Sequence, residues 1–193
     1  MEKCAGAVIT WLIRQHAIEE KDRELYAYAA YNMLLSAAPL ILVLIFGMFL
    51  GGVRQGIVMI LPYMMIRKFS GGYHAKTLKR CLLFSSLALV LCIEISLWVS
   101  WNWKLLVLTV AAGCSLMLFS PIDSENRRLE AAQKHQYQKI VCRFVVLFLI
   151  MILVTWKLGA DEYALCIAVG IILSAGLQIP CLVKRSKINQ NRP

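Results

Sequence analysis

A histidine and a cysteine in the segment RKFSGGYHAKTLKRC, residues 67–81, could together carry out nucleophilic catalysis. A thiol attacks a carbonyl group as the thiolate, so a catalytic cysteine needs a nearby base or a lowered pKa. His74 could be the base for Cys81. Cys81 also starts an apolar stretch, and the N-terminal dipole of a helix there would favour the thiolate. Three cations add positive potential near the thiol: Lys76, Lys79 and Arg80.

The spacing of His74 and Cys81 restricts the backbone between them. In one continuous helix, residues seven apart share a face but lie about 10 Å apart along the axis. Proton transfer requires heavy atoms about 3 Å apart, so a catalytic pair requires a chain that folds back. Gly71 and Gly72 could allow this, because glycine tolerates unusual backbone angles. By spacing alone, an ordinary basic loop between membrane helices stays an open alternative.

A third catalytic group would be an acid that orients the histidine. Glu94 lies within an apolar segment, where an acid suggests function by default, but about 20 Å of helix separates it from Cys81. Asp123 ends an apolar segment on the same predicted side as His74 and is the better candidate. Its alternative role is that of an ordinary loop or helix-end residue.

The composition excludes several classes of protein. Hydrophobic residues make up 60% of the 193 residues, charged residues make up 17%, and the mean hydropathy is +0.66. These values predict an all-α polytopic membrane protein with a single domain. The net charge of +10 is scattered over loops, which does not indicate a nucleic-acid partner. Seven cysteines without a CxxC pair argue against disulfides and zinc, and no cofactor is expected.

Six apolar segments follow an amphipathic N-terminal helix that we expect over residues 1–31, on the inner membrane surface. The second segment is short for a spanning helix and contains Pro62. Basic residues gather in 67–81, in 121–139 and in the tail, so the positive-inside rule predicts six crossings with both termini cytoplasmic. The segments cover approximately residues 33–51, 56–66, 82–100, 104–120, 140–156 and 161–183.

The pattern Arg67-x4-Gly72-x-His74-x6-Cys81, between the second and third apolar segments, resembles the AgrB family. These are the accessory gene regulator B membrane peptidases of Gram-positive quorum sensing. The resemblance extends to length, basic charge and the order of apolar segments. The loop SPIDSENRRLE at 120–130 is similar to a Pro-rich basic loop of the family, although it lacks the usual Lys-Pro after the asparagine.

The resemblance implies a specific reaction at His74 and Cys81. A membrane-embedded cysteine endopeptidase would cut the acidic C-terminal tail from an AgrD-like precursor and leave the signal part on Cys81 as an acyl-enzyme thioester. A thiol of the precursor would then displace the enzyme and close a thiolactone. The resemblance places the enzyme in the bacterial cell membrane, in contact with lipids, and is compatible with a homodimer.

The basic residues of the segment could attract the acidic tail of the precursor. Each exposed contact would contribute about 0.2–1 kcal/mol and would weaken in salt. The alternative is that these cations only orient the protein in the membrane. The residues concerned are Arg67, Lys68, Lys76, Lys79 and Arg80.

Two other hypotheses remain at the level of sequence. A small transporter or scaffold without peptidase activity could line a path with its membrane prolines and polar residues; these are Pro39, Pro62, Pro180, Glu94 and Gln178. Another membrane thiol acyltransferase is the second. A transporter should tolerate serine in place of Cys81, which separates it from a peptidase. The Gly47-x3-Gly51 motif predicts a helix contact, within the chain rather than in a dimer.

Overall fold

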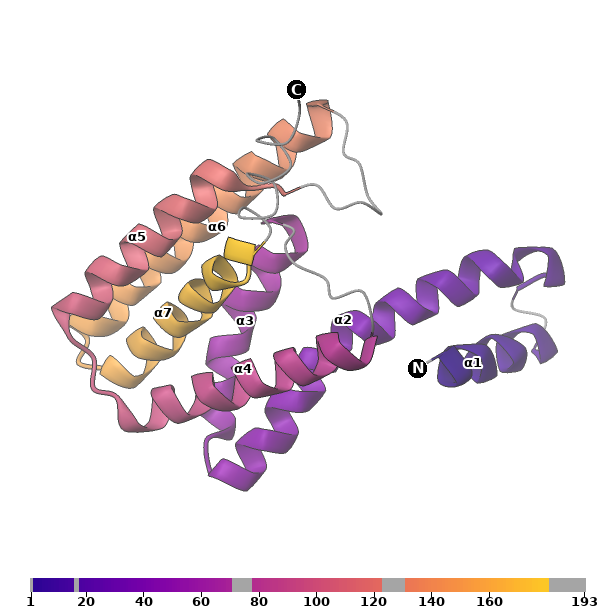
Figure 1. Cartoon of the computed structure of the whole chain (residues 1–193), viewed down its shortest axis with the longest axis horizontal. Coiled ribbons are helices and arrows are strands. Elements are labelled where there is room, and N and C mark those ends of the chain that lie inside the picture. Colours follow the sequence, from indigo (N-terminus) through magenta and orange to yellow (C-terminus); the bar gives the residue numbers. More distant parts are fainter. Residues whose placement is uncertain (1, 16–17, 71–77, 123–130, 181–193) are drawn as a thin grey trace. The chain divides into compact units, whose positions relative to one another are not determined.

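The computed structural model describes residues 2–15, 18–70, 78–122 and 131–180, and the regular elements among them are all helices (Figure 1). The all-α prediction is confirmed for these residues. The helices are α1 (Glu2–Arg14), the 3-10 helix η1 (Glu20–Asp22), α2 (Arg23–Leu50), α3 (Val53–Ser70), α4 (Leu78–Trp98), α5 (Trp103–Phe119), α6 (Ala131–Lys157) and α7 (Asp161–Gly176).

The chain forms two compact units, residues 1–42 and 43–193. In the first unit, α1 is amphipathic, with Ile9 buried and Trp11 exposed. The predicted single helix over residues 1–31 is wrong in extent, because α1 ends at Arg14 and α2 begins at Arg23. A run of charged residues between the two helices interrupts the apolar periodicity. These residues form two ion pairs around η1, Lys21–Glu19 and Arg23–Glu20.

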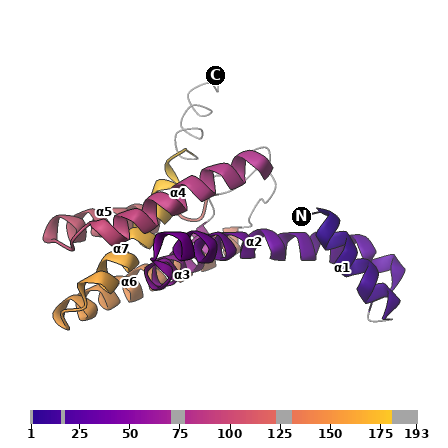
Figure 2. The ribbon, with the colours of Figure 1, turned by 90° about the horizontal axis from the view of Figure 1, so that it is seen from below.

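Helix α7 is central to the second unit and packs against α3, α4, α5 and α6 (Figures 1 and 2). Its residues 164–171 are all buried, as expected for a helix that is apolar around its whole circumference. Gly170 permits the close approach of α7 to α3. A Cβ atom at Gly170 would meet the carbonyl oxygen of Met59 and would lie 2.7 Å from Cγ of Pro62.

The six predicted segments correspond one to one with α2–α7, but their bounds differ. The segment predicted over 56–66 is an 18-residue helix that reaches Ser70 and is about 27 Å long. Helix α6 begins at Ala131, before the predicted 140, and α7 ends at Gly176, before the predicted 183. Apolar runs mark where side chains avoid water, whereas backbone hydrogen bonds continue a helix through polar residues at its ends.

One helix in the described part of the chain, Gln133–Lys157, is long and apolar enough to cross a membrane. Only 22% of the most apolar stretch of this helix is buried, whereas a core helix of a soluble protein is mostly buried. Three shorter apolar stretches accompany it: Ala37–Leu50, Ser86–Trp98 and Trp103–Phe119. Large apolar side chains are also exposed on several helices, among them Phe49, Leu61, Leu91, Val107 and Leu147. Six crossings of the membrane stay a prediction.

Two short connections are closed by glycines with positive φ, Gly51 at 72° and Gly159 at 71°. The Gly52 N–H donates to the Gly47 carbonyl over 2.9 Å, and the Ala160 N–H donates to the Thr155 carbonyl over 2.9 Å. Both are the 6→1 bonds of a helix C-terminal Schellman motif. The Gly47-x3-Gly51 motif therefore makes its contact within the chain, where it ends α2.

Candidate functional site

The predicted catalytic segment lies between α3 and α4, and parts of it are helical. Residues 67–70 form the last turn of α3 and residues 78–81 the first turn of α4, so the loop is shorter than the predicted 67–81. Cys81 is the fourth residue of α4. Its backbone therefore lies near the positive end of the helix dipole, as the sequence predicts.

Several predicted site residues cannot be compared with the structure. Lys79 and Arg80 have backbone positions in the first turn of α4. The others lie outside the described residues: Gly72, His74, Lys76 and Asp123.

Arg67 and Lys68 are placed in the last turn of α3. Aromatic contacts hold this turn against α6, because the Phe69 ring lies 5.6 Å from the Tyr137 ring and 5.9 Å from the Phe144 ring, between centroids. Arg67 is half-buried and Lys68 is exposed. The Lys68 ammonium group lies 5.7 Å from the centroid of the Phe69 ring. The end of α3, held by these contacts, therefore carries both Arg67 and Lys68.

Three buried polar residues bring the ends of α3, α5 and α7 together, and we call Ser70, Ser120 and Gln178 the amide clamp. Gln178 is 0% exposed and lies in the turn after α7. Its Nε2 donates to Ser120 Oγ over 2.7 Å and lies 3.5 Å from the Ser70 carbonyl oxygen. The same Ser70 carbonyl accepts a hydrogen bond from the Ile122 N–H over 2.9 Å.

The amide clamp fixes the chain where both predicted site segments begin. Ser70 is followed by the segment that contains Gly72 and His74, and Ile122 is followed by Asp123. Gln178 is 108 residues from Ser70 and 58 from Ser120 along the chain. Tertiary structure alone therefore joins these three helix ends.

The other half of the Gln178 amide is unusual. Its Oε1 is buried and has no hydrogen-bond partner among the described residues. A buried acceptor left unpaired costs about 1–3 kcal/mol. From the sequence, Gln178 was predicted only as part of a transport path, and the available signal was a polar residue near the end of an apolar segment.

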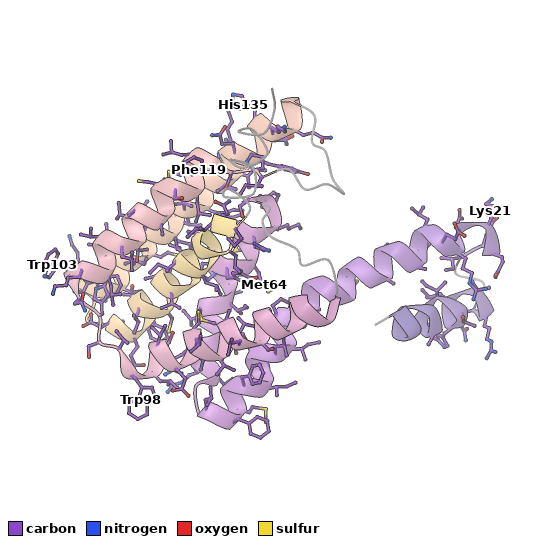
Figure 3. The ribbon with its side chains drawn as sticks, viewed as in Figure 1. Lys21, Met64, Trp98, Trp103, Phe119 and His135 are labelled. Carbon is purple, nitrogen blue, oxygen red and sulfur yellow. The ribbon has the colours of Figure 1, made fainter. Side chains whose placement is uncertain are left out.

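A cavity of about 410 Å³ lies beside the amide clamp and shares Ser120 with it. On the α6 side, the Gln138 Nε2 donates to the Met117 carbonyl of α5 over 3.1 Å. Lys134 and His135 line the side of the cavity that α6 forms. Its lining is completed by Leu118, Phe119, Pro121 and Gln138. Figure 3 shows Phe119 and His135 near one end of α5 and α6, and Trp103 at the opposite end.

Glu94 lies at the other end of the second unit. It accepts a hydrogen bond from the Trp98 indole N–H over 2.8 Å. Gly52, which directly precedes α3, adjoins Leu97 of the same α4 end, whereas Gln178 adjoins Ser70 at the far end of α3. About 27 Å of helix separates these ends. Glu94 and Gln178 therefore lie near opposite ends of the second unit and do not belong to one site.

Metal chemistry has no candidate site in the residues that the structure covers, since no group of three His, Cys, Asp or Glu side chains there could hold an ion.

Comparison with known proteins identifies the chain's relatives. The family model described as accessory gene regulator B matches residues 5–181. The chain belongs to the AgrB family. Family membership connects it with the accessory gene regulator system of quorum sensing and with membranes, and confirms the resemblance seen in the motif.

Two curated AgrB-like proteins are similar to this AgrB family member. AgrB-like protein 2 of Clostridium perfringens (strain 13 / Type A) is 22% identical over 129 residues, which cover 63% of this chain and 60% of that protein. An AgrB-like protein of Clostridium perfringens (strain SM101 / Type A) is 20% identical over 154 residues, covering 73% and 72%. The match thus spans less than two thirds of the first relative's length. No solved structure matches the chain.

Proposed function

We propose that this chain is a membrane cysteine endopeptidase that removes the C-terminal tail of an AgrD-like precursor and closes the remaining peptide into a thiolactone. The observation that carries the proposal is the motif Arg67-x4-Gly72-x-His74-x6-Cys81 in a chain of the AgrB family. The position of Cys81 in the first turn of α4 supports it, because the helix dipole there stabilises a thiolate.

The first half of the reaction would break the peptide bond before the tail. His74 takes the proton of the Cys81 thiol, and the thiolate attacks the scissile carbonyl carbon. The C–N bond then breaks, and His74 returns the proton to the leaving amine of the tail. The signal part stays on Cys81 as a thioester.

The second half of the reaction would close the ring. A thiolate of the precursor attacks the thioester carbon, the new C–S bond forms, and Cys81 leaves as a thiolate. One thioester replaces another, so the step is near energetic balance. Water must stay out of the site, because hydrolysis would otherwise consume the thioester.

We propose that α2–α7 cross the bacterial cell membrane, with both termini cytoplasmic. Two sets of contacts support alternating crossings, because the amide clamp joins one set of helix ends and Trp101 meets Trp156 at the other, 6.1 Å between ring centroids. Exposed apolar side chains on several helices support lipid contact. A homodimer is compatible with this arrangement.

The acidic tail of the precursor would approach the basic end of the second unit. Exposed Lys68, together with Lys134 in the lining of the 410 Å³ cavity, supports this orientation. Four further cations between residues 67 and 81 would add to this positive electrostatic potential: Arg67, Lys76, Lys79 and Arg80. Asp123 stays the proposed acid that orients His74.

Co-expression with the adjacent short open reading frame tests the proposal, if that frame encodes a central cysteine and an acidic tail. Mass spectrometry would follow tail loss and a thioester adduct on Cys81. We expect both in the wild type, neither in Cys81→Ala or His74→Ala, and loss of ring closure in Cys81→Ser. Cys114→Ala is the matched control, since Cys114 is an exposed cysteine on α5 that is not part of the motif. Unchanged processing in Cys81→Ala would overturn the peptidase and favour the transporter or scaffold.

A further inference from the structure

We infer that Gln178 is a positioning residue of the reaction proposed above, and the inference rests on that proposal. Its Nε2 holds the ends of α3 and α5. Its Oε1 accepts a hydrogen bond from an N–H group when the precursor is bound and processed. The juxtaposition that points to this role is the amide clamp, in which one half of the Gln178 amide is bound and the other half is buried without a partner among the described residues.

The contacts of the amide fix which atom is left unpaired. Nε2 faces both Ser120 Oγ, at 2.7 Å, and the Ser70 carbonyl oxygen, at 3.5 Å. An amide turned by 180° would direct Oε1 at the Ser70 carbonyl, and two acceptors would then face each other. The network therefore favours the orientation in which Oε1 is the unpaired atom.

Fold stability accounts for the Nε2 half of the Gln178 amide, which bonds to Ser120, but not for its buried Oε1. Its neighbours along α7 are apolar or bond to their own helix, as Ser174 does when its Oγ donates to the Gly170 carbonyl over 2.9 Å. An apolar side chain of the same length would leave no buried acceptor at position 178, although it would also lose the bond to Ser120. A buried acceptor without a partner among the described residues is a candidate for a contact with the substrate or with a catalytic group.

The place of Gln178 connects it with the chemistry. Its two bonded partners are the last residue of α3 and the residue directly after α5, and these precede the segments that carry the motif histidine and Asp123. A catalytic base needs a third group to orient it, and an amide oxygen can hold an imidazole N–H in place of a carboxylate, so Gln178 is an alternative to Asp123 for this purpose. A backbone N–H of the bound precursor offers the same donor chemistry.

The test uses the full-length protein in membranes with the precursor peptide, comparing the wild type with Gln178→Met, Gln178→Glu and Ser174→Ala. Methionine keeps the length of the side chain and removes both polar atoms, whereas glutamate keeps an acceptor. We expect Gln178→Met to lower the thermal midpoint, because the Nε2 bond to Ser120 is lost, and to lose about 10- to 100-fold in kcat per folded molecule, the range that a misplaced reacting group produces. We expect glutamate to recover part of that loss and Ser174→Ala to match the wild type.

The kinetic profile identifies the donor. A shift of the acidic limb of the kcat/KM profile in Gln178→Met would assign it to an imidazole, and an increase in KM at constant pH profile would assign it to the precursor backbone. Gln178→Met with wild-type kcat, KM and pH profile would overturn the inference alone. So would a fall in activity that only follows a lower thermal midpoint. Processing that does not depend on Cys81 would overturn the proposed function first.

Discussion

The two ends of the helical bundle in the second unit are built from different interactions. At one end, the amide clamp joins α3, α5 and α7 through buried hydrogen bonds. At the other end, Trp101 packs edge to face on Trp156, and Gly51 and Gly159 close short turns. Each end also holds one buried polar atom without a hydrogen-bond partner among the described residues, Gln178 Oε1 and Trp101 Nε1, respectively.

The connections between α2 and α3, α4 and α5, and α6 and α7 contain two, four and three residues, respectively. At the amide-clamp end, the segments that follow Ser70 and Ile122 lie outside the described residues, and they contain His74 and Asp123. Short connections leave little room for reactive side chains. The comparison predicts that changes at the tryptophan end lower stability alone, whereas changes that disturb the amide-clamp end lower activity as well.

The largest effect on stability is expected from Gly170→Ala, because Gly170 allows α7 to pack closely against α3. The new methyl group would meet the carbonyl oxygen of Met59, a backbone atom that cannot easily move. We expect a loss of about 1–3 kcal/mol, measured as a lower thermal midpoint in detergent, with processing reduced as well.

Gly176→Ala is the matched control for this change, because a Cβ atom there has open space. It should match the wild type or exceed it slightly. Equal midpoints for the Gly170 and Gly176 variants would show that the close contact between α3 and α7 does not organise the amide-clamp end.

A smaller effect is expected at the tryptophan end from Gly51→Ala and Gly159→Ala. Both residues have positive φ, which costs an alanine about 1–2 kcal/mol. We expect lower thermal midpoints with kcat per folded molecule unchanged. Gly51→Asn should recover part of the loss, since asparagine tolerates this conformation. A fall in kcat without a fall in the midpoint would break the proposed division between the two ends.

The smallest effect is expected from exposed charges. Lys68→Ala at the amide-clamp end should raise KM for an acidic precursor by no more than about fivefold, the equivalent of 1 kcal/mol, and the difference should shrink in salt. Lys104→Ala is the control, because Lys104 is an exposed lysine at the start of α5, on the tryptophan end. An equal change in both variants would indicate general membrane orientation rather than attraction of the tail.

Several parts of the fold could be predicted from the sequence because they depend on local patterns. Apolar runs located all six long helices, and the glycines at 51 and 159 stand where two of them end. The bounds were less accurate: α3 reaches Ser70, and the N-terminal helix stops at Arg14. Charged residues can extend a helix or end it, and the outcome depends on neighbours that are distant in the chain.

The sequence by itself determined the family motif, the candidate pair His74 and Cys81, and the excess of basic charge, since each depends on residue types at fixed spacings. Only the tertiary structure decided that α7 is the central helix and that Gln178 meets Ser70 and Ser120. The physical reason is that a buried amide is defined by its partners. Those partners are 108 and 58 residues away along the chain, and no local pattern records them.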